Sequence, residues 1–263
     1  FCKTLQCINM HPRMLWPKVQ MFQRRMRGCI TFSTLEAKVA LVGIDFGCKN
    51  SRVAMINSLV PQVVENEIGR STPSYVTLTE LSTSVPCPWA LQHLERVGRH
   101  AAVGELAKRK MLRQPSDVVF NVKKMIGKQF DDDYIQEMRK RVCFKIIEGP
   151  GGEAWVEIHG MKFSPVEITS AIFAKLLDIV LMYEYHDKLK VVISVPTFFS
   201  EQQRESISIA GNRAGLEILQ FIEEPVAAAL SSSTIKEGTV VVFCMGAGSY
   251  GVSILQVSHS NIE

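Results

Sequence analysis

The sequence lacks several features that mark particular classes of protein. No apolar run reaches the ~18 residues that a membrane-spanning helix needs, because Lys175 and Asp178 interrupt the most hydrophobic stretch, 170–185. The seven cysteines include no Cys-x-x-Cys pair, which argues against a zinc site or a disulfide framework and favours a reducing compartment. Hydrophobic residues make up 46% of the 263 positions, enough for a sizeable core. We therefore expect a folded protein without a membrane span.

Acidic residues are nearly absent from the first 40 positions, where Glu36 alone faces seven Lys and Arg residues. This segment carries a net charge of +6, so the rest of the chain carries −2, although the whole chain is at +4. An Arg-rich, hydroxyl-bearing segment with almost no acids is typical of an organelle transit peptide, and an ordinary basic tail is the alternative. We therefore predict a basic leader over residues 1–38 and no nucleic-acid partner for the mildly acidic remainder.

Short apolar runs predict strands along much of the chain. Residues 39–45 and 52–56 flank a glycine-containing turn, which predicts a hairpin whose first strand is buried on both faces. The segment 81–95 has no clear period and is predicted to be an inserted loop. Further strands are expected at 62–65, 74–78, 190–195, 216–222 and 239–245.

Helix signals alternate with the later strands. Ser164 with Glu167, and Ser200 with Gln203, have the spacing of capping boxes, which predicts helices that run to about residues 185 and 214. Shorter helices are expected at 103–112 and 225–231. An antiparallel beginning followed by alternating strands and helices predicts an α/β fold with a mixed sheet and helices on its faces.

Four features of the sequence are suited to phosphate chemistry. Asp45 ends the first strand, and the turn at 47–50 that follows can present backbone N–H groups to an anion. A similar turn at 246–249 follows the strand at 239–245. Lys123 is a candidate phosphate ligand, and Glu224 precedes a proline-started helix. Asp45 is a candidate ligand of Mg²⁺, directly or through water, because Mg²⁺ takes few carboxylates and keeps most of its waters. Each feature also has a plain structural interpretation: hairpin turns, a solvated basic face, and an acid that complements a helix dipole.

Together, four segments of the chain resemble the DnaK-type, 70-kilodalton heat-shock chaperone family, in that family's order. They are 42–47, 191–199, 210–217 and 223–230, and the segments 130–132 and 154–157 are similar to its mitochondrial branch. The resemblance covers roughly residues 42–262. It implies an actin-like ATPase (ribonuclease-H-like) fold, with a mixed five-stranded sheet flanked by helices. It also implies a first lobe at 39–232 and the start of a second lobe at 233–263, incomplete because family members continue beyond this point.

The resemblance also implies the ligands and the site residues. It implies ATP or ADP with Mg²⁺, which Asp45 and Glu224 hold through water, while Lys123 positions the attacking water. Pro196 and Arg204 match a pair that relays the nucleotide state to the surface between the lobes. The cofactor-binding turns are formed by Gly47, Cys48, Lys49, Gly246, Ala247, Gly248 and Ser249.

Partners and location follow from the same resemblance. It implies a J-domain co-chaperone and a nucleotide-exchange factor as partners, and unfolded protein only if a peptide-binding domain exists elsewhere. It implies the mitochondrial matrix as the location, with the cytoplasm as the alternative. The expected function is that of the ATP-binding domain of a chaperone that assists protein folding.

This chain departs from the family at its chemistry. Cys48 and Lys49 stand where the family has two threonines, and Ala247 replaces a glycine. Cys244 and Gly251 stand where the family has two aspartates. Losing such acids lowers turnover by about 10² to 10⁴-fold, so hydrolysis is expected to be weak and enzymatic activity stays an open question.

Two alternatives belong to other functional classes. The first is a non-catalytic interaction module that binds co-chaperones without nucleotide turnover. The second is a nuclease on the same sheet topology with Asp45 and Glu224 as metal ligands. The nuclease needs a third carboxylate, which Cys244 and Gly251 do not supply.

Overall fold

The computed structural model describes residues 39–57, 60–66, 68–78, 101–183, 188–232 and 237–258. The leader predicted at 1–38 and the inserted loop predicted at 81–95 lie outside these residues. Within them, no helix combines the length and the apolar character that crossing a membrane requires.

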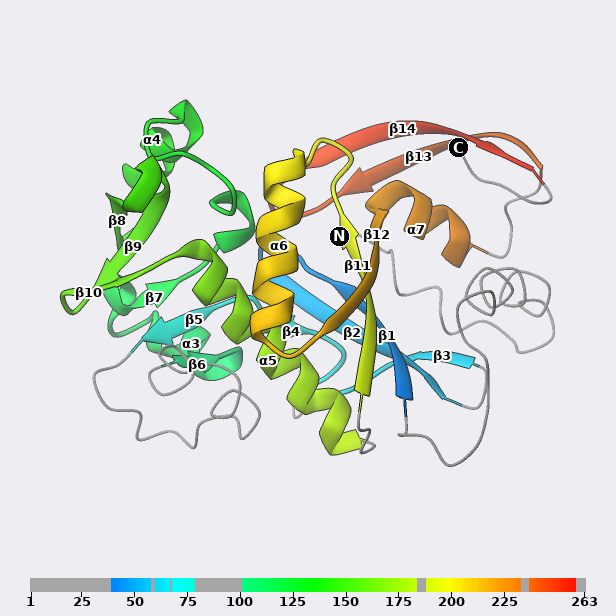
Figure 1. Cartoon of the computed structure of the whole chain (residues 1–263), viewed down its shortest axis with the longest axis horizontal. Coiled ribbons are helices and arrows are strands. Elements are labelled where there is room, and N and C mark those ends of the chain that lie inside the picture. The colour runs from blue at the N-terminus through cyan, green and yellow to red at the C-terminus, as the bar shows by residue number, and fades with distance from the viewer. Residues whose placement is uncertain are drawn as a thin grey trace.

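A mixed sheet forms the centre of the fold (Figure 1). Its main path has five strands in the order β12 (Glu217–Glu223), β11 (Lys188–Val195), β1 (Val39–Asp45), β2 (Asn50–Asn57) and β3 (Val60–Val63). β1 pairs in parallel with β11, and β11 with β12, whereas β1, β2 and β3 are antiparallel neighbours. The predicted hairpin and mixed five-stranded sheet are thus confirmed, and a short sixth strand, β4 (Thr72–Pro73), pairs with β2.

Two long helices, α5 (Pro165–Tyr183) and α6 (Glu201–Arg213), pack against each other and cover the sheet (Figure 1). Both begin at the capping boxes that the sequence predicts. The Glu167 N–H donates to Ser164 Oγ (3.1 Å), and the Ser164 N–H donates to the Glu167 carboxylate (2.9 Å). Ser200 and Gln203 form the same reciprocal pair. These bonds satisfy N–H groups at the first turn of each helix, which explains why the helices begin there.

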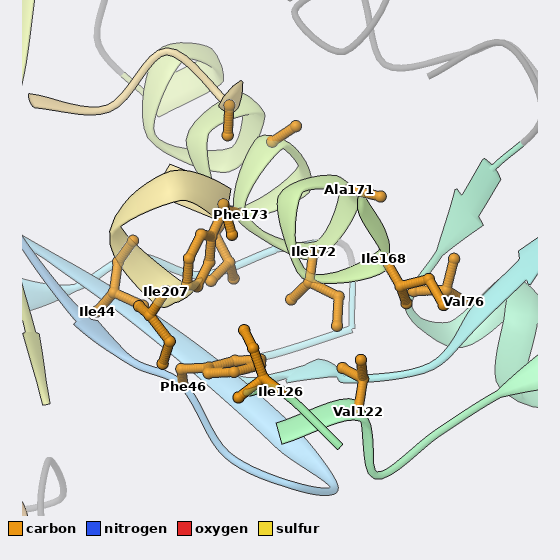
Figure 2. Packing of buried hydrophobic residues seen from close by; sticks show 14 of the residues in the cluster. Ile44, Phe46, Val76, Val122, Ile126, Ile168, Ala171, Ile172, Phe173 and Ile207 are labelled. Carbon is orange, nitrogen blue, oxygen red and sulfur yellow. The ribbon is translucent and has the colours of Figure 1, made fainter. Parts of the chain in front are cut away.

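The main core lies between the sheet and these helices (Figure 2). Phe46, directly after β1, packs edge to face on Phe173 of α5, with ring centroids 5.2 Å apart. Successive side chains of a strand point to opposite faces, and Val42 and Ile44 are buried whereas Leu41 and Gly43 are half-buried. The prediction that β1 is buried on both faces is therefore wrong for one face, because the helical layer lies over the other.

A second region extends from the sheet on the side of α4 (Asp133–Arg139) (Figure 1). It contains two small antiparallel sheets, in which only the strand expected at 74–78 was predicted from the sequence. It also contains the helix α3 (Glu105–Lys110), which confirms the helix expected at 103–112. The first sheet has β8 (Lys145–Glu148), β9 (Ala154–Ile158) and β10 (Met161–Phe163), and the second has β5 (Val76–Leu78), β6 (Ala101–Val103) and β7 (Val118–Val119).

After β12 the chain forms α7 (Glu224–Ser231) and then a two-stranded ribbon of β13 (Gly238–Met245) and β14 (Tyr250–Val257) (Figure 1). The helix and the first strand of the ribbon confirm the elements expected at 225–231 and 239–245. Along β13 exposed residues alternate with half-buried ones. Large apolar side chains therefore face solvent on one side of the ribbon, at Val241, Phe243, Met245, Tyr250, Val252 and Ile254.

Candidate functional site

A cleft with a volume of about 620 Å³ lies where the central sheet meets the ribbon. The two glycine turns, at 47–50 and 246–249, both line it. Among the site residues predicted from the sequence, only Arg204 does not line the cleft. The structure thus brings together side chains and turns that are up to about 200 residues apart in the chain.

Asp45 lies at the carboxyl end of β1, at the edge of the sheet where the first turn begins. In the β1–β2 hairpin its register partner is Arg52, and the Arg52 guanidinium lies 3.3 Å from Asp45 Oδ2. Burial raises the pKa of the Asp45 carboxyl above its usual range, and the nearby charges of Lys123 and Arg52 act against this rise. Asp45 is therefore already engaged by a cation from its own hairpin.

Lys123 comes from the 3₁₀ turn Val122–Lys124, which follows the left-handed residue Asn121. Its ammonium lies 5.8 Å from the ring centroids of both Phe46 and Phe199, and it donates to Glu224 Oε1 at 2.7 Å. Only 7% of the Lys123 side chain is exposed. A buried ammonium needs such a charged partner and favourable ring faces, so the cleft holds this lysine in one position.

The first turn is tied closely to the strands around it. Ser74 Oγ donates to the Gly47 carbonyl (2.8 Å), the Ser74 N–H donates to the Lys49 carbonyl (2.8 Å), and the hydroxyls of Ser74 and Ser51 lie 2.8 Å apart. A Cβ at position 47 would overlap the carbonyl oxygen of Asn50, so the turn needs glycine there. These bonds fix the direction of the turn's backbone groups.

The second turn touches the first. Gly246 N–H donates to the Ser249 carbonyl at 2.8 Å and closes the turn. A Cβ on Gly248 would lie less than 3.0 Å from Cys48 Sγ and 2.7 Å from Lys124 Cε, so the backbone of Gly248 packs directly on these two side chains. Burial raises the pKa of the Cys48 thiol, although Lys123 and Lys124 oppose this effect.

Only one of the two predicted relay residues lines the cleft. Pro196 follows β11, is buried and lines the cleft. Arg204 lies on α6 and forms a partly exposed pair with Glu223 at 3.7 Å. The structure places Glu223 directly before Glu224, so Arg204 reaches the neighbour of a cleft residue. The relay itself stays a prediction.

Sequence reasoning missed several residues of the cleft. Arg52 could have been found from the register of the hairpin, since a turn at 47–50 places it opposite Asp45. Lys124 is adjacent to Lys123, and its ammonium lies 5.0 Å from the ring centroid of Tyr134. Nothing local in the sequence places Tyr134 beside this lysine.

The acids of the cleft do not fit a divalent cation. Asp45 faces Arg52 and Glu224 faces Lys123, so each carboxylate that the resemblance assigns to magnesium already has a cation beside it. Across the described residues, no group of three or more His, Cys, Asp or Glu side chains is placed to hold a metal ion. Cys244 and Gly251, opposite each other in the ribbon, add no carboxylate.

Most of the chain is similar to known proteins. The sequence profile of the family described as "Hsp70 protein" matches residues 41–263. The chain is 37% identical over 234 residues to "Heat shock 70 kDa protein, mitochondrial" of Solanum tuberosum and 36% identical to the protein of the same name from Pisum sativum. Each alignment covers 88% of this chain and 32% of the relative.

A bacterial relative shows the same relationship. The chain is 34% identical over 227 residues to "Chaperone protein DnaK" of Carsonella ruddii (strain PV), which covers 85% of this chain and 35% of the relative. The chain thus spans about a third of the length of these curated relatives. Because the family profile matches most of the chain, and the α/β structure with its mixed sheet agrees with the actin-like ATPase fold of that family, this chain belongs to the Hsp70 family.

Proposed function

We propose that this chain binds ATP or ADP in the cleft between its two glycine turns, as the nucleotide-binding part of a molecular chaperone. In this proposal residues 39–232 are the first lobe and residues 233–263 are the start of the second. The Hsp70 family in general binds ATP or ADP with magnesium. The observation that carries the proposal is the meeting of Lys123, Glu224 and both turns in one cleft.

The chain's own residues have distinct parts in this proposal. The backbone of the first turn, fixed by Ser74, presents N–H groups to the phosphates. Lys123 neutralises charge that develops on the terminal phosphate, and Glu224 holds the lysine in place. No further acid lies on the ribbon beside these groups, so we propose that hydrolysis is weak.

Partners and location complete the proposal. The relatives carry names of mitochondrial heat-shock proteins and of a chaperone, so we propose the mitochondrial matrix as the location. We further propose a J-domain co-chaperone and a nucleotide-exchange factor as partners. Unfolded protein is a partner only where a peptide-binding domain accompanies this part.

A second candidate function is interaction without nucleotide turnover. The specific observation in its favour is the apolar face of the ribbon, where Phe243, Tyr250 and Ile254 are 61%, 80% and 72% exposed. Exposed apolar patches of this kind mark surfaces that bind other proteins. A chain that binds no nucleotide and still binds a co-chaperone supports this candidate over the first.

Calorimetric titration with ATP and with ADP tests the proposed function, in buffers with MgCl₂ and with EDTA. Binding is expected in at least one buffer, and the Lys123→Met variant is expected to bind roughly tenfold or more weakly, because a charged hydrogen-bond donor is lost while the stem is kept. Lys145→Met, an exposed lysine paired with Glu157, is the matched control and should bind normally. The absence of binding in both buffers contradicts the proposed function.

Hydrolysis is measured separately. Phosphate release with MgATP is expected to be no faster than for Lys123→Met. Turnover clearly above that variant contradicts weak hydrolysis and leaves the binding proposal intact.

A further inference from the structure

The cleft carries more positive than negative charge. Five cationic and two acidic side chains line it, which leaves an excess of three positive charges. Three of the cations are paired with acids at close range. They are Arg52 with Asp45 (3.3 Å), Lys123 with Glu224 (2.7 Å) and Lys128 with Asp132 (2.8 Å).

Lys49 and Lys124 are the two remaining cations, and neither forms an ion pair with another described residue. Lys49 is exposed on the first turn. Lys124 packs its Cε on Gly248 of the second turn. The two lysines therefore lie beside the two glycine turns of the cleft, since Lys49 belongs to the first turn and Lys124 packs on the second.

The pairing of Arg52 with Asp45 disfavours the binding of a divalent cation at this carboxylate. The register of the hairpin places the guanidinium beside the carboxylate, so the pair is built into the sheet rather than formed by a chance approach of two surface side chains. Asp45 is only 14% exposed, and a divalent cation at this carboxylate would meet the positive charge of Arg52 at close range. Mg²⁺ bound at a protein is usually held by one or two carboxylates together with phosphates, and here both carboxylates are engaged.

We propose that the cleft binds the polyphosphate of a nucleotide without a divalent cation, with Lys49 and Lys124 supplying the charge that a metal ion otherwise supplies. This inference rests on the proposed function, since it names the form in which that site takes its ligand. Metal ions bridge phosphate oxygens and neutralise their charge in phosphoryl-transfer sites. Two ammonium groups that line the cleft neutralise the same oxygens as point charges.

The same charge argument applies where MgATP enters the cleft with its metal facing solvent. In that case Mg²⁺ lowers the charge on the ligand and weakens its attraction to a cleft with excess positive charge. Removing Mg²⁺ should therefore strengthen binding or leave it unchanged, and it should not abolish binding. Binding without the metal should also weaken steeply with ionic strength, because charge attraction carries it.

The experiment is calorimetric titration of the full chain with ATP in EDTA and in excess MgCl₂. The expected result is binding in EDTA that is at least as tight as in MgCl₂. Lys49→Gln and Lys124→Gln should each weaken binding in EDTA roughly tenfold, since each removes a charged donor to phosphate. Lys145→Gln, at an exposed lysine that does not line the cleft, should bind as the parent chain does.

A second variant tests the part assigned to Arg52. Arg52→Gln frees Asp45, so Mg²⁺ should now strengthen ATP binding compared with EDTA, whereas Arg70→Gln, a surface arginine paired with Glu65, should leave the preference of the parent chain unchanged. Thermal unfolding is measured for each variant as the control that it is folded. Binding that occurs in MgCl₂ and not in EDTA overturns this inference and leaves the proposed function standing. The absence of binding in both buffers overturns the proposed function itself.

Discussion

The two glycine turns look alike in the sequence and are supported very differently in the structure. The first, at 47–50, follows the central strand β1, which has β2 on one side and β11 on the other. The second, at 246–249, joins the two strands of a ribbon whose large apolar side chains face solvent. Each turn lines the cleft, but only the first belongs to a packed sheet.

The hydrogen bonds repeat this contrast. Ser74, which follows β4, holds the first turn through hydrogen bonds from both its hydroxyl and its backbone N–H. The second turn is closed by the bond from Gly246 to Ser249 and packs on Cys48 and Lys124 through Gly248. The first turn is therefore positioned by its own sheet, whereas the position of the second depends on its contact with the first. Four experiments test this difference between the two turns.

The largest effect is expected from the core beneath the first turn. Phe46 lies directly before Gly47 and packs on the ring of Phe173. Phe173→Ala removes this ring and should lower the free energy of unfolding by about 3–5 kcal/mol. Phe243→Ala, on the exposed face of the ribbon, should change stability by less than about 0.5 kcal/mol. Urea unfolding followed by circular dichroism measures both, and equal losses would show that the ribbon face is packed as the core is.

The next effect tests the contact between the turns. Gly248→Ala places a methyl group against Cys48 Sγ and Lys124 Cε, and overpacking of this kind costs about 1–3 kcal/mol. ATP binding should weaken by about tenfold, since each ~1.4 kcal/mol is a factor of ten. Gly246→Ala is the matched control, because its new Cβ would meet only the Ser249 carbonyl oxygen, at 3.6 Å.

A double variant gives this test a second readout. Cys48→Ala removes the sulfur that meets the new methyl group, so it should restore much of the binding and stability that Gly248→Ala loses. Additive losses in the double variant would mean that the two turns do not touch through these side chains.

A smaller effect is expected from the hydrogen bonds of the first turn. Ser74→Ala removes the donor to the Gly47 carbonyl and the partner of the Ser51 hydroxyl in a buried setting, and should cost about 1–2 kcal/mol. Ser249→Ala in the second turn should have almost no effect, since this serine is exposed and its hydroxyl has no hydrogen-bond partner in the described part of the chain. Chemical denaturation of both variants shows whether a serine hydroxyl stabilises the first turn and not the second.

Local rules of helix and strand formation account for what could be predicted from the sequence. Ser164 with Glu167 predicts the start of α5, because the capping bonds join residues three positions apart. β9 alternates buried and half-buried residues over 154–158, and the apolar residues at 154, 156 and 158 are the sequence signal of such a strand. The burial of one face of β1 could not be predicted, because it depends on which elements cover the sheet.

In the candidate site, too, some contacts follow from local rules and others depend on the packing of distant segments. The pair of Asp45 and Arg52 follows from the length of one turn and is a local property. The pair of Lys123 and Glu224 joins residues 101 positions apart, and no spacing rule connects them. Only the family resemblance brought these two residues to the same site, and the contact of Gly248 with Cys48 depends on how the ribbon packs on the sheet.

The smallest effect concerns the reactivity of Cys48, a residue of the first turn whose sulfur contacts the second turn. Burial raises the pKa of its thiol, so at neutral pH less of it is thiolate, and alkylation by iodoacetamide should be slower than at the exposed Cys143. The rate should rise with pH as the thiolate forms. Lys123 lowers this pKa, so Lys123→Met should slow the reaction further, whereas Lys145→Met should not. Peptide-level mass spectrometry follows each cysteine separately, and a Cys48 that reacts as fast as Cys143 at neutral pH would show that the second turn does not cover it.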